Sequence, residues 1–467
     1  MVSRPRRIAI VPRSVRFLPA LLLLALTACG GGDGGPGAGA PGLGDPYFPK
    51  AGNGGYDVGH YALDLSYDPA RRHLDGTVTV TARATEDLSA FNLDLAGLKV
   101  EEVTVAGERA RFSRDGQELT VRPPRPLDRG ETFETRVRYA GTPRTLTDPD
   151  GSREGWLFTE DGAVALGEPM GSMTWFPGNH HPADKASYEL TVSVPEGVEA
   201  VSNGEPSDER TRGGRTVRTW RTEEPMASHV ATLAVGDYAV RRSTAAGHPA
   251  YTAVDRSEGE PDAVDELPGV MEWAEYNFGP YPFTSTGLIV APAGVSDYAL
   301  ETQNRPVFPG APDTALLVHE IAHQWFGNSV SPESWRDMWL NEGFATYAEW
   351  LWEEDQGGES ARERFESVYA EDDPELWSFP PAKPSGPAHI SDRPVYDRGA
   401  MVVHRIREQV GDDAFYDLVQ GWTARHRHGN ADTEDFTRYV EERVPDEDFD
   451  EIWADWLYGE GKPDSPR

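Results

Sequence analysis

The spacing of apolar residues changes once along the chain, and this change indicates a fold built from two unlike parts. From about Tyr56 to Tyr238 the spacing has a period of two, and Ser187 to Val194 alternates polar and apolar residues at every position. Residues 77–81 and 133–139 alternate less regularly, and breaks rich in Gly, Pro, Asp and Asn separate these runs. Such alternation is typical of strands with one buried face, so this half predicts a large antiparallel β domain.

After about Pro261 the apolar residues recur with a helical period instead. Asp313 or Thr314 follows a proline and can cap a helix, which Gly327-Asn328 would end. Four further segments have a helical apolar face: residues 344–351, 401–410, 414–425 and 433–443. The fold class we expect is therefore α+β and multidomain, with an antiparallel β domain at residues 51–245 and a mainly α-helical domain at residues 246–467.

The N-terminus has the features of an export signal. An apolar run at residues 17–26 is too short to span a bilayer, and it follows five basic residues: Arg4, Arg6, Arg7, Arg13 and Arg16. The run closes on Leu26-Thr27-Ala28-Cys29, which resembles a bacterial lipobox. We expect residues 1–29 to be a lipoprotein signal peptide and Cys29 to carry lipid, which would anchor an exported protein to the extracytoplasmic face of a bacterial membrane. The alternative for Cys29 is an ordinary buried thiol, and the export route stays open.

Composition adds three expectations. Residues 30–50 are rich in Gly and Pro, which predicts a flexible tether between the anchor and the folded domains. Cys29 is the only cysteine, so the exported chain would have no internal disulfide. The net charge of -34 argues against nucleic acid and anionic lipid surfaces as partners, and its simplest role is solubility.

Two histidines one helical turn apart predict a metal site. His319 and His323 stand at positions i and i+4 of a predicted helix, so both rings point from one face and can bind a single zinc ion. Glu342 follows His323 by 19 positions and opens the next predicted helix, where it can supply a third ligand and leave a fourth position for water. Each feature has a simpler explanation, namely chance for the histidine pair and a solvated acid at a helix N-terminus for Glu342. The histidine pair and Glu342 together favour a metal site over these simpler explanations.

The residue between the histidines predicts hydrolysis. Zinc lowers the pKa of a bound water to about 7 and polarises a carbonyl group. Glu320 would project beside the histidines, where it can act as a general base that takes a proton from the water and later gives it to a leaving amine.

The segments around these residues resemble the gluzincin zinc aminopeptidases of the aminopeptidase N family. The resemblance rests on VHEIAHQWFGN at residues 318–328, WLNEGFA at 339–345, PMASHVATLAVGDY at 225–238, and Gly167-Glu168-Pro169 with Trp175-Phe176-Pro177. It extends over roughly residues 56–463 and implies a thermolysin-like catalytic domain behind the β domain. Larger members of the family carry a further C-terminal helical domain over the active site, so this short form is expected to have a more open cleft.

The resemblance implies roles for three more residues. Tyr396, in VYDRGA, matches a tyrosine that hydrogen-bonds the oxyanion of the tetrahedral intermediate. Glu301 and Glu168 match two glutamates that bind the free α-ammonium of the substrate by charge-assisted hydrogen bonds. The chain departs from the family at Tyr298-Ala299-Leu300 before Glu301 and at Thr302, where the family usually has Asn, so the pocket for the first side chain should differ.

These observations predict a zinc-dependent aminopeptidase that acts on peptides with free N-termini. Three alternatives stay open: a zinc endopeptidase, an epoxide-opening branch of the same family, and an inactive peptide-binding lipoprotein. His180 and His181 are a conceivable second metal site, but no third ligand is evident, which favours a structural role. The sequence specifies neither the oligomeric state nor the preferred first residue of the substrate.

Overall fold

We describe the fold from a computed structural model, which describes residues 36–465. The predicted signal peptide and Cys29 lie outside the described residues. Within residues 36–465, no helix is both long enough and apolar enough to cross a membrane.

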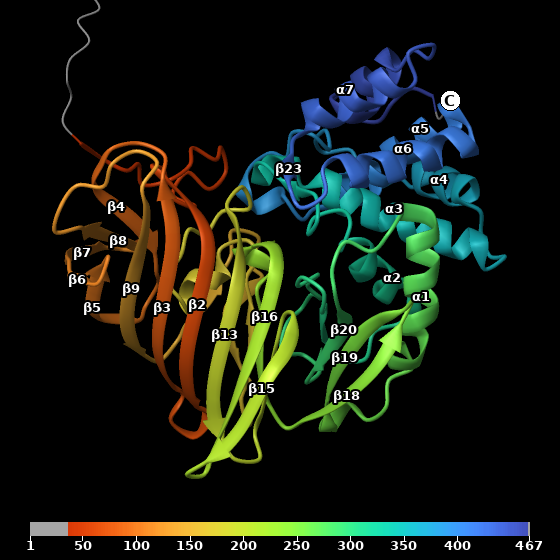
Figure 1. Ribbon diagram of the computed structural model, residues 1–467. Coiled ribbons are helices and arrows are strands. Elements are labelled where there is room, and N and C mark those ends of the chain that lie inside the picture. The colour runs from red at the N-terminus through yellow and green to blue at the C-terminus, as the bar shows by residue number, and fades with distance from the viewer. Residues whose placement is uncertain (1–35, 466–467) are drawn as a thin grey trace, which may run out of the picture. The chain divides into compact units, whose positions relative to one another are not determined.

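The first half of the chain forms the predicted β domain around one large sheet (Figure 1). Apolar and polar residues alternate along its long strands, so one face of the sheet is buried. The sheet is mostly antiparallel, but its central strands β2 and β13 run parallel, which the sequence pattern did not reveal. Its strands, in spatial order, are β15 (Glu205–Arg212), β16 (Arg215–Ala227), β13 (Lys185–Pro195), β2 (Tyr56–Asp68), β3 (His73–Ala84), β9 (Thr132–Gly141), β5 (Lys99–Val105) and β6 (Glu108–Arg109).

Two smaller sheets complete this domain. Leu93, Trp156 and Val235, one from each of three short strands, are fully buried together with residues of the large sheet in one apolar core. The first small sheet contains β1 (Gly37–Ala38), β4 (Leu88–Asp94), β8 (Glu118–Arg122) and β7 (Arg111–Asp115). The second contains β10 (Thr145–Thr147), β11 (Arg153–Phe158), β12 (Ala163–Leu166), β17 (Leu233–Gly236) and β14 (Glu199–Ser202).

The second half places seven helices beside a four-stranded mixed sheet (Figure 1). The sheet contains β18 (Tyr238–Ala245), β19 (His248–Asp255), β20 (Thr286–Ala291) and β21 (Val307–Pro309). The helices are α1 (Ala263–Phe278), α2 (Thr314–Ala322), α3 (Trp339–Asp355), α4 (Ala361–Ala370), α5 (Gly399–Val410), α6 (Asp412–Arg425) and α7 (Thr433–Arg443). A two-stranded parallel pair, β22 (Ser331–Pro332) and β23 (Asn430–Ala431), joins the segment after α2 to the segment before α7.

The structure confirms the predicted helices and adds two that the sequence hid. α1 contains Pro268 and Gly269, which read as a break, yet its other face is buried at Leu267, Met271 and Ala274. α4 is mostly polar, with only three buried residues. The metal-site helix α2 begins as expected, because the Asp313 side chain accepts a hydrogen bond from the Leu316 N–H, but it ends at Ala322, earlier than predicted.

Residues 36–50 are not the flexible tether that their composition predicted. They pack against the folded body, because the few residues that are neither Gly nor Pro provide anchors. The buried Asp45 carboxylate accepts hydrogen bonds from the Trp335 backbone N–H (2.9 Å) and the Ser334 hydroxyl (3.0 Å). Phe48 packs edge-on against the Trp335 ring, and the Tyr47 hydroxyl donates to the Pro384 carbonyl at 2.6 Å.

The interface between the two halves is apolar as well as polar. Ile289, Ala291 and Val307 belong to the sheet of the second half but pack into the apolar core of the β domain. The buried Arg305 guanidinium donates to the carbonyls of Ser202 and Gly204 in the β domain. The two halves therefore share one buried boundary, which holds the loops that enter the site in fixed positions.

Candidate active site

Helix α2 places both histidines on its buried face. His319 is 7% exposed and His323 is 1% exposed, and His323 immediately follows the last residue of the helix. Their rings pack edge to face with centroids 4.8 Å apart. The i, i+4 spacing therefore brings the two imidazoles together as the sequence predicted.

Helix α3 brings Glu342 against the two rings. Its Oε2 lies 3.3 Å from the Nε2 atom of His319 and 3.3 Å from the Nε2 atom of His323. Ligand atoms about 2.0–2.1 Å from a zinc ion at tetrahedral angles are about 3.3–3.4 Å from one another. The two distances from the Glu342 oxygen therefore fit a shared zinc ion. The donor set of two imidazole nitrogens and one carboxylate oxygen fits it as well, so His319, His323 and Glu342 can hold zinc.

The other nitrogen of each imidazole already has a partner. The His319 Nδ1 lies 2.6 Å from the Oε1 atom of Glu349, two turns along α3 from Glu342, and the His323 Nδ1 lies 3.0 Å from the Phe326 carbonyl oxygen. Such contacts place the proton on Nδ1 and leave Nε2 free to bind a metal. Glu349 was not predicted as a site residue, although it follows Glu342 by seven positions and so lies on the same face of α3 as Glu342.

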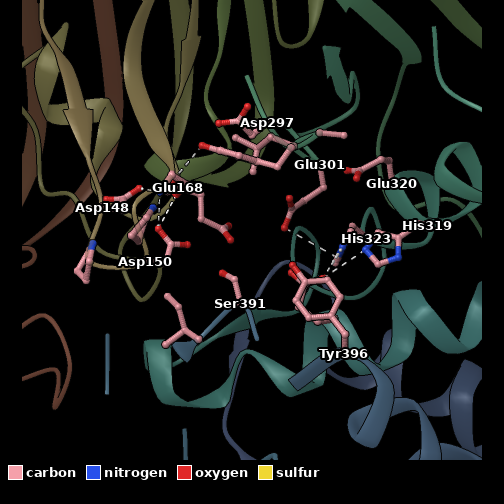
Figure 2. A pocket seen from close by; sticks show the side chains of 18 of the residues that line it. Asp148, Asp150, Glu168, Asp297, Glu301, His319, Glu320, His323, Ser391 and Tyr396 are labelled. Carbon is pink, nitrogen blue, oxygen red and sulfur yellow. Dashed lines mark hydrogen bonds and ion pairs between the residues drawn. The ribbon is translucent and has the colours of Figure 1, made fainter. Parts of the chain in front are cut away.

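A cavity of about 290 Å³ opens beside this group (Figure 2). All seven predicted site residues line it, from five separate segments of the chain: Glu168, Glu301, His319, Glu320, His323, Glu342 and Tyr396. The structure thus brings together residues that are more than 200 positions apart in the sequence.

Glu320 is well placed to exchange protons. It is 4% exposed, and its Oε2 atom has no hydrogen-bond partner within the described residues. Burial raises the pKa of the Glu320 carboxyl to about 8, although the nearby His319 and His323 lower it. A buried carboxylate without a protein partner is suited to hold a water molecule and accept its proton.

Glu301 and Glu168 place two more carboxylates in the cavity, next to the metal ligand Glu342. Single carboxylate oxygens of Glu168, Glu301 and Glu342 lie within 4.8 Å of one another. Glu301 is 4% exposed and its Oε1 has no hydrogen-bond partner within residues 36–465; the Oε2 atom of Glu168 likewise has none. Burial, together with the charge of neighbouring carboxylates, raises the pKa of both groups. Carboxylates packed this closely need a cationic partner to stay ionised.

The segment that follows α2 also fixes Glu301. The Gln324 side chain donates to the Glu301 carbonyl at 3.2 Å, and the Asn328 side chain donates to the same oxygen at 2.5 Å. The Gln324 Oε1 atom also accepts from the Asn304 N–H at 2.6 Å. Glu301 therefore keeps a fixed position relative to His323, and the chain's departures at Tyr298 to Leu300 and at Thr302 do not remove it from the cavity.

Tyr396 also lines the cavity, from the π-helical turn Pro394–Arg398 before α5. Its ring is nearly parallel to the His319 imidazole, with centroids 6.0 Å apart. Burial, with the charges of Glu342 and Glu168, raises the pKa of the phenol well above its usual value. The hydroxyl therefore stays protonated at neutral pH and can donate a hydrogen bond into the cavity.

His180 and His181 do not form a second metal group within the described residues. His180 contacts the Ser228 hydroxyl and the Phe176 carbonyl oxygen, both at 3.0 Å, so both ring nitrogens are occupied. His181 lies 3.4 Å from the Asp45 carboxylate of the N-terminal segment. These contacts agree with the structural role that the sequence favoured.

Comparison with known families and structures agrees with this geometry. A family model described as "Peptidase M1 N-terminal domain" matches residues 58–230, and one described as "Peptidase family M1 domain" matches residues 311–456. A solved M1 zinc metallopeptidase from Deinococcus radiodurans, bound to a Tyr-Ser-Ala substrate, is 30% identical with a TM-score of 0.84. The match covers 91% of this chain and 100% of that one.

Two curated relatives are longer than the matched region. Aminopeptidase M1-D of Oryza sativa subsp. japonica is 27% identical over 335 residues, which cover 65% of this chain and 38% of the relative. Aminopeptidase B of Mus musculus is 25% identical over 449 residues, which cover 84% of this chain and 66% of the relative. The alignment with the rice protein thus spans less than half of that protein's length.

Proposed function

Because this chain belongs to peptidase family M1, a family of zinc metallopeptidases, we propose that it is an aminopeptidase that removes the N-terminal residue from peptides. One observation carries the proposal: the cavity holds two carboxylates, Glu168 and Glu301, that the metal does not need. They lie beside the metal group, and within the described residues one oxygen of each, Oε2 of Glu168 and Oε1 of Glu301, has no hydrogen-bond partner. A free α-ammonium is the cation that every peptide N-terminus can offer them.

The position of these carboxylates explains why only one residue would be removed. A peptide whose ammonium lies between Glu168 and Glu301 places its first carbonyl one residue further along, toward His319 and His323. A chain that continued beyond its N-terminus would offer the two glutamates an uncharged amide in place of an ammonium, and two neighbouring carboxylates would then lack a cation. The two carboxylates therefore favour the aminopeptidase over an endopeptidase.

The chain's own residues account for the proton transfers. When held by His319, His323 and Glu342, zinc supplies a Lewis acid that polarises the scissile carbonyl and lowers the pKa of a water molecule. Glu320 accepts the proton of the attacking water and passes it to the leaving amine. Tyr396 donates a hydrogen bond from its protonated hydroxyl to the oxyanion as the tetrahedral intermediate forms.

A matched substrate pair tests this function. We expect the zinc-loaded protein to release an aminoacyl fluorophore from a free-amine substrate and not from its N-acetylated counterpart, and Glu320→Gln to lose this turnover while it keeps zinc. Equal cleavage of both substrates would indicate an endopeptidase. Turnover of an epoxide and of neither peptide would indicate the epoxide-opening branch. Zinc binding without any turnover would indicate a binding protein.

We further propose that the protein is exported and anchored by lipid at Cys29. The proposal is supported by the basic N-terminus, the short apolar run and the lipobox at residues 26–29. Metabolic labelling with radioactive palmitate should mark the wild type and not Cys29→Ser, and the variant should leave the membrane fraction. Unlabelled wild-type protein in the soluble fraction would contradict the anchor.

A further inference from the structure

One buried histidine of the β domain has no hydrogen bond to account for its burial. His229 lies in the short 3-10 turn η3 (Ser228–Val230) between β16 and β17 and is 2% exposed. Neither of its ring nitrogens has a hydrogen-bond partner in the part of the chain that the structure describes. An unpaired buried imidazole costs free energy, so its presence needs a reason. The other buried histidines each have at least one ring partner: His180, His181, His319, His323 and His404.

The polar group that faces the His229 ring is the carboxylate of Glu168. The Nε2 atom of His229 lies 3.8 Å from the Oε2 atom of Glu168, and this oxygen is buried and has no hydrogen-bond partner within residues 36–465. The distance exceeds that of a hydrogen bond, but a shift of about 1 Å or less would form one, and such contacts often tighten only when substrate binds. Glu168 lines the cavity and His229 does not, so the imidazole can affect the site only through this carboxylate.

The backbone around His229 is fixed against the loop that carries Glu168. A Cβ atom at Gly167 would lie 2.3 Å from the His229 carbonyl oxygen, so only glycine allows the two segments to approach this closely. The Ser172 hydroxyl also donates to the Ser228 carbonyl at 2.5 Å. The segments before and after Glu168 are therefore both packed on η3, which keeps the imidazole next to the carboxylate.

The His229 ring is held as a neutral donor. Burial, then the nearby Lys185 and His181, lower the pKa of the imidazole to about 3, so one ring nitrogen carries a proton at neutral pH and the ring has no charge. The Trp335 ring packs edge to face on it, with centroids 5.0 Å apart. A neutral N–H satisfies one oxygen of Glu168 without cancelling its negative charge, whereas a cation would compete with the substrate ammonium.

We propose that His229 is a positioning residue that donates its Nε2–H to Glu168 and so holds this carboxylate in place for the substrate ammonium. The inference rests on the proposed aminopeptidase function and adds a residue to its ammonium recognition. The buried Oε2 atom takes the hydrogen bond from His229, which leaves the other oxygen of Glu168 for the substrate. His229 itself does not touch the peptide.

Two substitutions at His229 test the donor. His229→Leu removes it, and His229→Gln keeps a neutral N–H donor on a side chain of similar reach. With the zinc-loaded protein and a free-amine aminoacyl coumarin, we expect His229→Leu to raise KM about tenfold and to leave kcat within about threefold, and His229→Gln to restore most of the loss. His73→Leu, at a 42% exposed histidine of the same domain, is the control and should change neither value.

The same assay separates failure of this inference from failure of the proposed function. A KM of His229→Leu within twofold of the wild-type value, or an equal rise in KM for His229→Leu and His229→Gln, would overturn the positioning role and leave the aminopeptidase intact. A wild-type protein that cleaves no free-amine substrate would instead overturn the proposed function.

Two hydroxamate inhibitors distinguish ammonium recognition from damage to the metal site. Leucine hydroxamate carries an α-ammonium beside its zinc-binding group, whereas acetohydroxamate has the zinc-binding group alone. We expect His229→Leu to raise the inhibition constant of leucine hydroxamate about tenfold and to leave that of acetohydroxamate within twofold. An equal rise for both inhibitors would show that the substitution disturbs the metal site, and would overturn the inference.

A double variant shows whether His229 acts through Glu168. If it does, Glu168→Gln combined with His229→Leu should have the same KM as Glu168→Gln alone, because the carboxylate that His229 holds is already gone. Losses that add would contradict the inference. Thermal unfolding should find His229→Leu at least as stable as the wild type, since it breaks no hydrogen bond within the described residues, and a lower melting temperature together with a lower kcat would assign His229 to the structural core.

Discussion

At the scale of single residues, the chemistry depends on which imidazole nitrogen carries the proton. Glu349 and the Phe326 carbonyl oxygen each occupy an Nδ1 atom, so both Nε2 atoms face Glu342 with lone pairs available for a metal. Of the two partners, only Glu349 can be altered without changing the backbone.

Glu349→Gln should therefore weaken zinc binding without unfolding the protein. The Glu349 side chain is 33% exposed, so the substitution is tolerated by packing, but the charge that holds the His319 ring is lost. We expect the zinc dissociation constant to rise about 10–100-fold, as for other partners of metal-bound histidines. Competition against a chromophoric chelator would measure it, with Glu353→Gln, exposed one turn further along α3, as the control. An unchanged zinc affinity would show that Glu349 does not orient His319.

Tyr396→Phe should lower kcat and leave substrate binding nearly intact. The phenol hydroxyl makes no hydrogen bond to the protein within residues 36–465, so its loss breaks no structural contact and removes only a donor into the cavity. We expect kcat to fall about 10²–10³-fold, the usual effect of losing one oxyanion donor, with KM and zinc content unchanged. Stopped-flow and steady-state kinetics on one good substrate would measure this, and a change smaller than threefold would assign Tyr396 to packing.

The sequence predicted the residues of the metal group because their spacing is local. His319 and His323 are one helical turn apart, and Glu342 begins the next helix, so short-range periodicity was sufficient. Glu349 was missed because its contact with His319 depends on how α3 packs on α2.

At the scale of elements, the local sequence pattern predicted which segments form strands and helices, but not how strands pair or where helices end. The sequence predicted strand β13 and helices α3, α5, α6 and α7 correctly, because each of these elements buries one face. The parallel pairing of β2 with β13 and the end of α2 at Ala322 were not predicted, because strand order and helix ends are set by contacts distant in sequence. The Gly- and Pro-rich segment at residues 36–50 was misread for the same reason, since its anchors bind Ser334 and Trp335.

The loop between residues 178 and 184 ends on a buried acid, Asp184, that should make stability depend on pH. Asp184 is buried, and its carboxylate accepts from the Asn179 side chain and the Val58 N–H. Burial, and the charge of Asp57, raise its pKa from 3.8 to about 8. Because the folded protein binds this proton more tightly than the unfolded chain does, the stabilisation is complete below pH 3.8 and is lost progressively as the pH rises to about 8.

Asp184→Asn should remove this pH dependence, because the amide has the shape of the protonated acid and does not ionise. Urea unfolding at pH 5 and pH 8 would measure the free energy of unfolding. We expect the variant to gain stability relative to the wild type as the pH rises. Asp446→Asn, the same change at an exposed aspartate after α7, is the control and should show no such gain. A difference between Asp184→Asn and wild type that is equal at both pH values would contradict the buried, proton-binding role of Asp184.

At the scale of the whole molecule, the cavity exists only while the two halves stay in register. Lys185, the first residue of β13, reaches the segment that follows α2. Its ammonium donates to the carbonyls of Asn328 (2.9 Å), Ser329 (3.0 Å) and Gly429 (3.3 Å). Burial lowers the pKa of this ammonium to about 7, so the position is costly for a charge, and the three carbonyls offset part of that cost.

Lys185→Met should destabilise the folded protein by about 1–3 kcal/mol, because a side chain of similar length cannot donate to these carbonyls, and the Ser329 carbonyl has no other donor within the described residues. Calorimetry on the zinc-loaded protein would measure the loss. Lys383→Met, an exposed lysine of the second half, is the control and should have little effect. A variant as stable as the wild type would show that Lys185 does not hold the two halves together.

The central claim is that one zinc ion and one substrate ammonium occupy adjacent positions in the cavity. Crystals of the protein soaked with zinc and L-arginine, measured with X-rays at the zinc absorption edge, test it most directly. We expect one anomalous peak bonded to His319, His323 and Glu342, and the α-ammonium of arginine within hydrogen-bond distance of Glu168 and Glu301. A zinc peak on other side chains, or an amino acid bound with its ammonium away from both glutamates, would contradict the account.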